Sequence, residues 1–331
     1  MGITCKWALD PGSEMLRIRF CETGETVTFP ACAVFEENGQ TVALGEAALV
    51  AEDRLPPGLR WSRPFVRGTI TDENDATALL SAALERNGSK HSGKILGAVA
   101  LSDTLTGVQV NAWKRVLKRC GTVQMRRVLP EMALAAASDK PSGCMVDAGA
   151  RSTELLIYEN RSIVFSARLE NGLSDWDDVL IRFCRIRHRL RIGHPTASWM
   201  RLRLGCALPR KEIWRSEYMG IDLSEGLPVR RAIDSDIVYE ALNDSVEAWC
   251  QEVAGRLLPR LSKKEDILLV GGGSAFFGLA DRLSAVCNRP VYIPASATFR
   301  KLLGICRIEG GVIPETELPD TPAANKDSEE Q

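Results

Sequence analysis

The chain has 331 residues, a formal net charge of -1, and 45% hydrophobic and 26% charged residues. This length allows two domains with separate cores, and the near-neutral charge gives no support for nucleic-acid binding. No apolar run approaches the roughly 20 residues of a membrane-spanning helix, and the amino terminus lacks a signal-peptide pattern. The ten cysteines include no C-x-x-C pair and there are three histidines, so no zinc site is expected. We therefore expect a cytoplasmic protein with reduced thiols.

Alternating apolar residues predict two or three strands in the first 30 residues, followed by a small irregular unit at 31–63. Helical spacing is expected at 75–87, 105–120 and 131–137, and buried strands at 94–101 and 123–129. Further on, helices are expected at 175–190, 196–204, 235–261, 280–287 and 296–306, with a strand at 291–293. The segment from Pro314 onward is rich in Pro, Asp and Glu, which predicts a disordered tail.

The segment 144–158 contains the most informative pattern in the chain. An apolar run ends at Asp147, a small-residue turn carries Gly149, and hydroxyls follow at Ser152 and Thr153 before a second apolar run. This pattern predicts a β-hairpin whose tip offers backbone N–H groups to phosphate oxygens. The carboxylate could hold Mg²⁺ through water. Taken alone, the segment is equally compatible with an ordinary hairpin turn.

Two other turns strengthen the phosphate interpretation. The apolar run before Asp10 leads into Pro11, Gly12 and Ser13, and an apolar strand follows, which repeats the first pattern. Near the carboxyl end, a buried-strand run leads into Gly271, Gly272, Gly273 and Ser274, where a backbone without Cβ atoms can approach a ligand closely. Repeated strand–helix patterns around these turns predict an α/β fold of two related lobes.

The chain resembles the actin-like ATPase superfamily and, within it, the bacterial MreB family of cell-shape filaments. The likeness runs collinearly from about residue 5 to 311. The Asp10 and Asp147 segments are similar to the family's two phosphate loops, and 269–274 to its adenosine motif. Other stretches that match are R-P-x-x-x-G-x-I-x-D at 63–72, P-E-M-A at 130–133, I-G-x-x-T-A at 192–197 and G-I-D-L-x-x-G-L-P at 220–228.

The resemblance implies an actin-like α/β fold of four subdomains with a central nucleotide cleft. The expected domains are lobe I at 1–146, with a small subdomain inserted at about 31–63, and lobe II at 147–313, with an insertion at about 173–243. Residues 314–331 would form an acidic tail. The resemblance also implies ATP and Mg²⁺ as cofactors. It implies that the chain forms filaments, either of its own copies or with a paralogous filament protein, and that cell-wall synthesis proteins are its partners.

The resemblance implies roles for individual residues. Glu131 would orient the attacking water, with Asp147 as the second catalytic residue, and Asp10 and Asp147 would place Mg²⁺ through water. The expected nucleotide contacts are Asp10, Gly12, Ser13, Gly149, Arg151, Ser152, Thr153, Gly193, Ser198, Arg201, Gly271, Gly272, Gly273 and Ser274.

Several positions depart from the family pattern. Ala150 and Arg151 occupy glycine positions of the second loop, and either would cost roughly 1–2 kcal/mol if φ must be positive; Arg151 could instead clamp a phosphate. Glu14 and Met15 replace Asn and Thr in the first loop, and Ser198 replaces the glutamate that contacts ribose. An alternative is therefore a degenerate scaffold that needs no nucleotide. A sugar kinase or chaperone ATPase of the same fold is a weaker alternative.

The third quarter is distinctly basic, with Arg and Lys residues throughout 182–215. A solvated helix face explains this composition, as does contact with an acidic neighbour, acidic lipid headgroups or the acidic tail. The polar loop at 87–94 argues against direct membrane insertion, although contact with the inner membrane surface is left open. The tryptophans Trp7, Trp113, Trp176, Trp199, Trp214 and Trp249 are expected in the core or at interfaces.

Overall fold

The computed structural model describes residues 5–21, 23–52, 55–85, 95–262 and 265–310. These residues form two compact units. Unit 1 comprises the described residues of Met1–Pro141, Asn160–Ile163 and Phe299–Pro319, and unit 2 those of Ser142–Glu159 and Val164–Thr298. The expected tail and the loop at 87–94 lie outside the described residues. No helix in the described ranges combines the length and apolarity required to cross a bilayer.

Unit 1 is built on a five-stranded sheet of order β10-β9-β1-β2-β3. Its strands are β1 (Cys5–Pro11), β2 (Met15–Phe20), β3 (Thr26–Pro30), β9 (Ile95–Ala100) and β10 (Thr122–Val128). The three strands of the first 30 residues pair as an antiparallel meander, whereas β9 pairs in parallel with both β1 and β10. The strands predicted for this part of the sequence are therefore confirmed.

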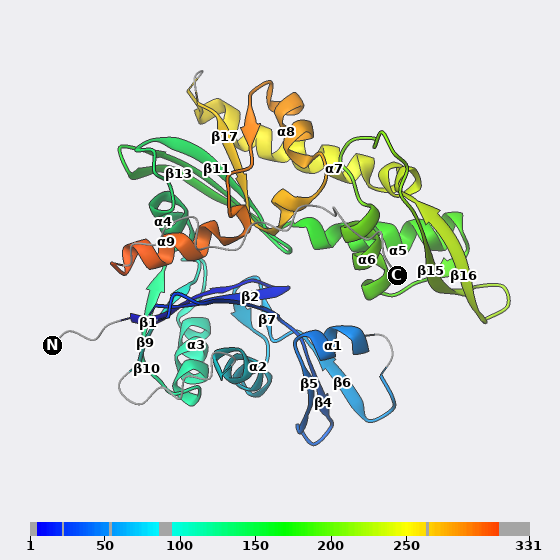
Figure 1. The fold of residues 1–331 in the computed structure, drawn as a ribbon, viewed down its shortest axis with the longest axis horizontal. Coiled ribbons are helices and arrows are strands. Elements are labelled where there is room, and N and C mark those ends of the chain that lie inside the picture. Colours follow the sequence, from blue (N-terminus) through cyan, green and yellow to red (C-terminus); the bar gives the residue numbers. More distant parts are fainter. Residues whose placement is uncertain (1–4, 22, 53–54, 86–94, 263–264, 311–331) are drawn as a thin grey trace. The chain divides into compact units, whose positions relative to one another are not determined.

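Helices cover both faces of this sheet, as Figure 1 shows. On one face lie α2 (Glu73–Glu85) and α3 (Gly107–Arg119), which pack on Trp7, Leu9 and Val99. On the other face α4 (Pro130–Ala136) and α9 (Arg300–Ile308) pack on small residues of the same strands, Ala8 and Ala98. Side chains of successive strand residues point to opposite faces, so the alternation of Trp7, Ala8 and Leu9 gives the sheet one bulky and one small-residue face.

The segment at 31–63 is regular, so the expectation of an irregular unit was wrong. Strands β4 (Ala33–Glu36), β5 (Thr41–Leu44) and β6 (Leu59–Ser62) form a three-stranded antiparallel sheet of order β5-β4-β6, and α1 (Glu46–Ala51) packs beside it. A short pair, β7 (Phe65–Val66) and β8 (Thr69–Ile70), follows. The strands have four residues or fewer, which is too short for a clear period-2 pattern.

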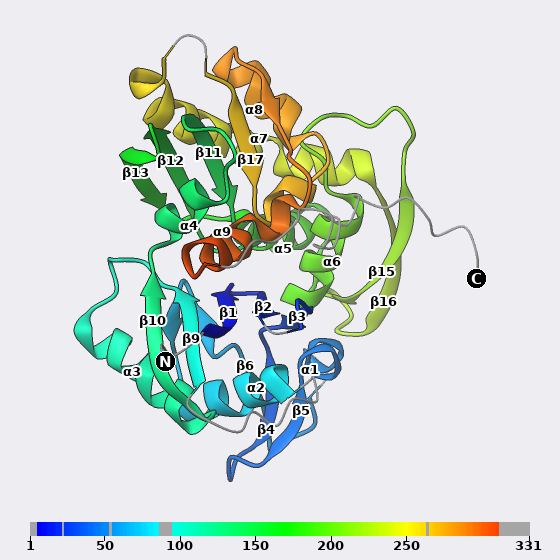
Figure 2. The same cartoon turned by 60° about the vertical axis from the view of Figure 1, so that its left-hand side comes forward.

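Unit 2 is built on a second five-stranded sheet, of order β13-β12-β11-β17-β18. It consists of β11 (Gly143–Ala148), β12 (Thr153–Glu159), β13 (Ser162–Leu169), β17 (Ile267–Val270) and β18 (Val291–Tyr292). The packed helices are α5 (Trp176–Arg187), α6 (His194–Leu204), α7 (Ser235–Leu257) and α8 (Leu279–Cys287), seen in two views in Figures 1 and 2. The expected helices are thus present, with ends that shift by a few residues.

Four strands of unit 2 were not expected from the sequence. Besides β13, a hairpin is formed by β15 (Arg215–Asp222) and β16 (Pro228–Asp234), and β14 (Leu190–Arg191) joins its edge. Most residues of β15 and β16 are at least partly exposed, so the apolar alternation that signals a half-buried strand is missing. Of the six tryptophans expected to be anchors, Trp7, Trp113, Trp176 and Trp249 are buried, and Trp199 and Trp214 pack partly buried against the core of unit 2.

Candidate functional site

The first predicted phosphate loop is a tight hairpin tip in unit 1. Strands β1 and β2 place Asp10 opposite Arg17 and Pro11 opposite Leu16, and the Gly12 N–H donates to the Asp10 carbonyl at 3.1 Å. A Cβ at Gly12 would lie 2.6 Å from the Met15 carbonyl oxygen, so any side chain there would force the turn apart. The loop therefore needs glycine at this position.

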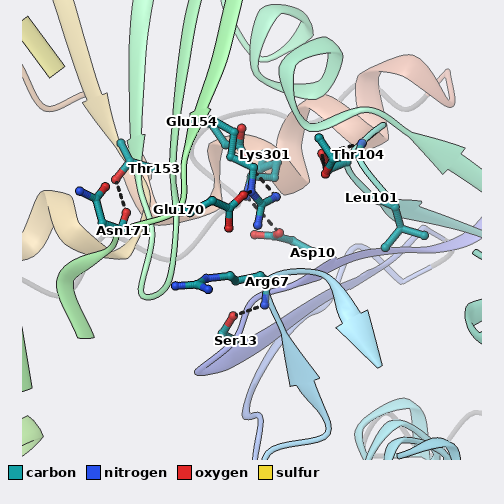
Figure 3. Close-up of polar contacts among 12 residues, drawn as sticks. Asp10, Ser13, Arg67, Leu101, Thr104, Thr153, Glu154, Glu170, Asn171 and Lys301 are labelled. Carbon is teal, nitrogen blue, oxygen red and sulfur yellow. Dashed lines mark hydrogen bonds and ion pairs between the residues drawn. The ribbon is translucent and has the colours of Figure 1, made fainter. Parts of the chain in front are cut away.

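Two cations flank the Asp10 carboxylate, which is 6% exposed. The Lys301 Nζ lies 3.4 Å from Oδ1, and the Arg17 Nη1 lies 3.8 Å from Oδ2; Figure 3 shows Lys301 beside Asp10. The Arg17 guanidinium also lies over the Phe299 ring, at 5.9 Å from its centroid, which helps to fix its position. The Asp10 carboxylate is therefore paired with two basic side chains of unit 1.

Ser13, the third residue of this tip, is held by the segment before β8. Its Oγ accepts a hydrogen bond from the Arg67 backbone N–H at 2.9 Å, and its carbonyl accepts one from Arg63 Nη1 at 3.2 Å. Arg67 adopts φ 52°, in the region that side chains rarely occupy. The tip is thereby fixed to the same stretch that matched the family pattern at 63–72.

Glu131 lies in the first turn of α4, a helix that α9 holds closely. A Cβ at Gly304 of α9 would lie 1.6 Å from the Ala133 carbonyl oxygen of α4, so the two backbones touch. At the carboxyl end of α4, Arg307 donates to the Ala137 carbonyl at 2.9 Å and Arg300 donates to it at 3.2 Å. These cations satisfy carbonyls that the helix leaves unpaired. The same helix α9 therefore positions Glu131 through α4 and carries Lys301.

The second predicted phosphate loop is the β11–β12 hairpin tip in unit 2. The Gly149 N–H donates to the Ser152 carbonyl at 3.0 Å, and a Cβ at Gly149 would lie 2.6 Å from that oxygen. Neither Ala150 nor Arg151 is among the described residues with positive φ. The substitutions of glycine by Ala150 and Arg151 therefore do not strain the backbone, and the cost considered from the sequence does not arise.

The short 3-10 helix η1 (Leu173–Asp175) holds this tip from outside. The Leu173 N–H donates to the Gly149 carbonyl at 3.1 Å, and the Ser174 N–H donates to the Ala150 carbonyl at 2.8 Å. The close approach depends on Gly172, because a Cβ there would lie 2.4 Å from the Ala150 carbonyl oxygen. The family pattern has glycines within the loop itself. Here the glycine that permits close packing at the loop is Gly172, 22 residues after Ala150.

The side chain of Arg151 contacts Asp175, with 3.3 Å between Nη1 and Oδ1. About a quarter of the Arg151 side chain (28%) is exposed, so its guanidinium faces solvent in part. A phosphate clamp by Arg151 remains a prediction.

The triple-glycine turn lies directly beside the Asp147 carboxylate. Strand β11 pairs in parallel with β17, and Asp147 lies opposite Val270, so the turn at Gly271 starts where the acid ends its strand. Gly271 has φ 83°, and a Cβ there would lie 2.1 Å from Asp147 Oδ1; a Cβ at Gly273 would lie 2.7 Å from the Ala148 Cβ. Two motifs about 120 residues apart in sequence therefore converge in space.

The remaining residues of this turn differ in exposure. Ser274 is buried and its Oγ donates to the Gly271 carbonyl at 2.7 Å, whereas Gly272 is exposed. Ser274 therefore supports the turn, and Gly272 presents backbone to solvent.

Helix α6 brings Gly193, Ser198 and Arg201 into the same network of unit 2. Gly193 is the residue before the helix, and Ser198 lies one turn from Arg201. The Arg201 side chain is 4% exposed; it donates to both carboxylate oxygens of Asp177, at 2.6 and 3.3 Å, and to Ser198 Oγ at 3.1 Å. It also reaches Ser174 Oγ at 3.4 Å. Arg201 therefore holds the start of α5, next to the loop, by a buried ion pair.

Thr153, one of the expected nucleotide contacts, is buried in unit 2. It is 0% exposed, and its Oγ1 donates to the Asn171 carbonyl at 3.1 Å while accepting from Trp249 Nε1 at 3.0 Å. Both hydrogen-bonding functions of the hydroxyl are therefore used inside unit 2. In this arrangement Thr153 supports the base of the hairpin tip and presents no surface to a phosphate.

The predicted Mg²⁺ ligand Asp10 has two cationic neighbours, Lys301 and Arg17. These cations oppose a divalent cation at Asp10, and the placement of Mg²⁺ by Asp10 and Asp147 stays a prediction. Within the described ranges, no group of three or more His, Cys, Asp or Glu side chains is placed to hold a metal ion.

Sequence reasoning missed the residues that surround these motifs. Arg17 could have been found, because hairpin register alone places it opposite Asp10. Lys301 and Asp177 could not, since each meets its partner only through tertiary packing and no local pattern marks it.

Comparison with known proteins identifies the family of this chain. The sequence pattern of the MreB/Mbl protein family matches residues 4–310. The cell shape-determining protein Mbl of Bacillus cereus is 25% identical over 300 residues, covering 86% of this chain and 90% of that protein. The cell shape-determining protein MreB of Escherichia coli strain K12 is 26% identical over 266 residues, covering 76% of each chain.

Solved structures show the same fold. The crystal structure of MreB5 of Spiroplasma citri bound to ADP superposes with a TM-score of 0.82 at 20% identity, over 92% of this chain and 98% of that one. A double helical filament of MamK superposes with a TM-score of 0.73 at 16% identity, over 93% of this chain and 99% of that one. The fold is thus actin-like, as the sequence resemblance implied, and the chain belongs to the MreB/Mbl family.

Proposed function

We propose that this chain is a cytoskeletal protein of the MreB type that binds ATP and assembles into filaments, either of its own copies or with a paralogous filament protein. Its curated relatives are named cell shape-determining proteins, and one similar structure is a double helical filament. We extend the proposal to cell shape, with cell-wall synthesis proteins as partners in the cytoplasm and contact with the inner membrane surface left open.

One observation carries nucleotide binding: the convergence of the Asp147 hairpin tip with the triple-glycine turn in unit 2. Methyl groups at Gly149, Gly271 or Gly273 would all meet neighbouring atoms at 2.7 Å or less. The N–H groups of Gly149, Gly271 and Ser274 donate to backbone carbonyls within unit 2, so the proposal assigns phosphate binding to other backbone N–H groups of these two turns. Similar structures are bound to ADP and to AMPPNP, which supports an adenine nucleotide as the ligand.

Magnesium and hydrolysis are finer parts of the proposal. An Mg²⁺ ion in the complex would be held by phosphate oxygens and, through water, by Asp147, where it would neutralise phosphate charge. The Glu131 carboxylate, in the first turn of α4, would orient a water molecule, and hydrolysis would be slow. Within the described residues, this carboxylate is not engaged in a hydrogen bond or ion pair, so it is available for such a role.

Isothermal titration with ATP and Mg²⁺ tests the nucleotide proposal. The chain should bind, and Asp147→Ala should weaken binding by at least ~10-fold, as expected for the loss of a charged group at a phosphate site. Asp281→Ala is the matched control, because Asp281 is exposed on α8 in the same unit. No heat from the parent chain at millimolar ATP would contradict the proposal.

A second function is favoured by the internal bonds of the expected nucleotide contacts. Arg201 is committed to Asp177, and Thr153 to Asn171 and Trp249. A degenerate family member could therefore act as a scaffold that co-assembles without nucleotide. Sedimentation of filaments separates the two functions: pelleting that is equal with and without ATP supports the scaffold, and pelleting that requires ATP supports the nucleotide-dependent filament.

A further inference from the structure

A short segment of unit 2, residues 171–176, contacts both candidate nucleotide loops of that unit, and we call it the clasp. The Leu173 N–H donates to the Gly149 carbonyl at 3.1 Å, and the Ser174 N–H donates to the next carbonyl of the hairpin tip at 2.8 Å. A Cβ built at Gly273 would lie 2.9 Å from Leu173 Cδ1, so the Leu173 side chain packs closely against the triple-glycine turn. Leu173 therefore joins the hairpin tip to this turn.

The carboxyl end of the clasp packs on aromatic rings. The Trp176 ring meets the Phe276 ring edge-on, with centroids 5.1 Å apart, and Phe276 directly follows η3 (Gly272–Ala275), the 3-10 helix of the triple-glycine turn. Trp176 also meets the Trp249 ring of α7, with centroids 6.5 Å apart and an angle of 88° between the rings. Such edge-on pairs are favourable beyond the area that they bury, so Trp176 gives the clasp a second contact with the turn.

Helix α7 holds the amino end of the clasp. The Asn171 Nδ2 donates to Glu252 Oε2 at 2.8 Å, and the Asn171 carbonyl accepts from Thr153 Oγ1, which in turn accepts from Trp249 Nε1; Figure 3 shows Thr153 beside Asn171. Trp249 and Glu252 are three residues apart on α7 and so lie on one face of the helix. The Asn171 Oδ1 is buried and finds no donor among the described residues, so the bond to Glu252 fixes this side-chain amide.

We propose that the clasp sets the spacing between the two candidate nucleotide loops of unit 2, and that Glu252 is the positioning residue that anchors it, a role that rests on the proposed nucleotide binding. A nucleoside polyphosphate that contacts both loops requires their backbone groups at one fixed spacing. Hydrogen bonds behind a binding site hold its contacts to within about 0.5 Å of the productive geometry. The Glu252 carboxylate acts through Asn171, and all the residues of this chain of contacts belong to unit 2.

The first measurement is the dissociation constant of a fluorescent ATP analogue in MgCl₂. The variant Glu252→Met removes the carboxylate and keeps a side chain of similar length, whereas Glu252→Gln keeps an acceptor for Asn171 Nδ2. Glu240→Met is the matched control on α7, because Glu240 and its partner Arg187 are both exposed and an exposed ion pair contributes little to stability. Urea unfolding establishes a temperature at which every variant is folded.

Glu252→Met should weaken binding at least about 10-fold, the size of effect found when a supporting hydrogen bond behind a ligand site is removed. Glu252→Gln and Glu240→Met should stay within about 3-fold of the parent chain, which is less than 1 kcal/mol. Rescue by glutamine would show that the accepting oxygen, and not the negative charge of Glu252, is what the clasp requires.

Hydrogen exchange without nucleotide tests the anchor itself. The Leu173 and Ser174 amides are bonded to carbonyls of the hairpin tip, so their exchange should rise about 10-fold or more in Glu252→Met, because the segment opens locally. A peptide from α8 should keep its protection in this variant, and the clasp of Glu252→Gln should exchange as in the parent chain.

The outcomes separate the role of Glu252 from the proposed function. If Glu252→Met lowers the urea midpoint but leaves the ATP affinity and the exchange of the clasp unchanged, Glu252 is a structural residue only and the positioning role is overturned, while nucleotide binding stands. If Glu252→Gln binds as weakly as Glu252→Met, the positioning role through Asn171 is overturned as well. If the parent chain binds no ATP analogue, the nucleotide function is overturned, and hydrogen exchange still decides whether Glu252 anchors the clasp.

Discussion

Replacement of Gly304 by alanine should separate α9 from α4 and destabilise unit 1. The new Cβ would lie 1.6 Å from the Ala133 carbonyl oxygen, whereas real Cβ contacts do not fall below 3.0 Å. The backbones must therefore separate by roughly 1.4 Å, and close packing leaves no space to absorb this. Overpacking of this kind costs about 1–3 kcal/mol. Alanine offsets about 1 kcal/mol through its higher helix propensity, so we expect a net loss of up to about 2 kcal/mol.

Gly255→Ala provides the matched control for this prediction. Gly255 also lies within a helix, α7, but no atom outside its immediate neighbours lies within 4 Å of a Cβ built there. The propensity gain then acts alone and should stabilise the chain by up to about 1 kcal/mol. Urea unfolding followed by circular dichroism should therefore shift the midpoint in opposite directions in the two variants. A Gly304→Ala midpoint equal to or above that of Gly255→Ala would refute the packing argument.

Three other predictions follow from buried or exposed polar groups. Arg201→Met should lower the free energy of unfolding by about 3–5 kcal/mol, because it leaves the Asp177 carboxylate buried without its partner. The double variant Arg201→Met/Asp177→Leu should recover most of this loss, as measured by urea unfolding. If the double variant recovers nothing, the loss of the ion pair is not the cause. Burial tends to raise the pKa of Asp75, but hydrogen bonds from the bidentate Arg60 and from a serine outweigh burial and lower that pKa below 3.8. Stability from this pair is therefore complete above pH 3.8 and lost as pH falls through the lowered pKa. The gap in urea midpoint between the parent chain and Arg60→Met should therefore narrow as the pH is lowered below 3.8, and a gap that does not change with pH contradicts the assignment. Among the nine cysteines whose burial the structure describes, which leave out Cys5, Cys21 is exposed and the others are buried or partly buried. A thiol reagent at pH 8 should therefore modify Cys21 before the other eight, and mass spectrometry that finds one of those eight modified earlier would contradict the burial pattern.

The sequence predicted those elements whose burial creates a regular pattern. The Asp147 hairpin was predicted because two apolar runs flank a turn of small residues, and that hairpin is confirmed. The strands β15 and β16 were missed, since charged residues such as Glu217 and Arg230 stand exposed along the hairpin and no apolar alternation remains. The unit at 31–63 was taken as irregular because its strands are too short to show a period.

Site residues were predictable as motifs but not as contacts. Asp10 and Asp147 could be chosen from local patterns, yet no local pattern indicates that Lys301 lies beside Asp10. Arg201 was chosen by resemblance, and its pairing with Asp177 depends on how α6 packs on α5. Such partners are set by tertiary packing, and a single sequence without relatives carries no signal for them.

The small-residue face of the unit 1 sheet has a mechanical consequence. Alanines at positions 8 and 98 let the side chains of α9 lie close to the strands, and the glycine at 304 brings the backbones of α9 and α4 into contact. Layers separated by long side chains can take up a displacement through rotamer changes, whereas helices in backbone contact must move together. A displacement of α9 would therefore be passed directly to α4, the helix that carries Glu131, so the two helices behave as one rigid pair.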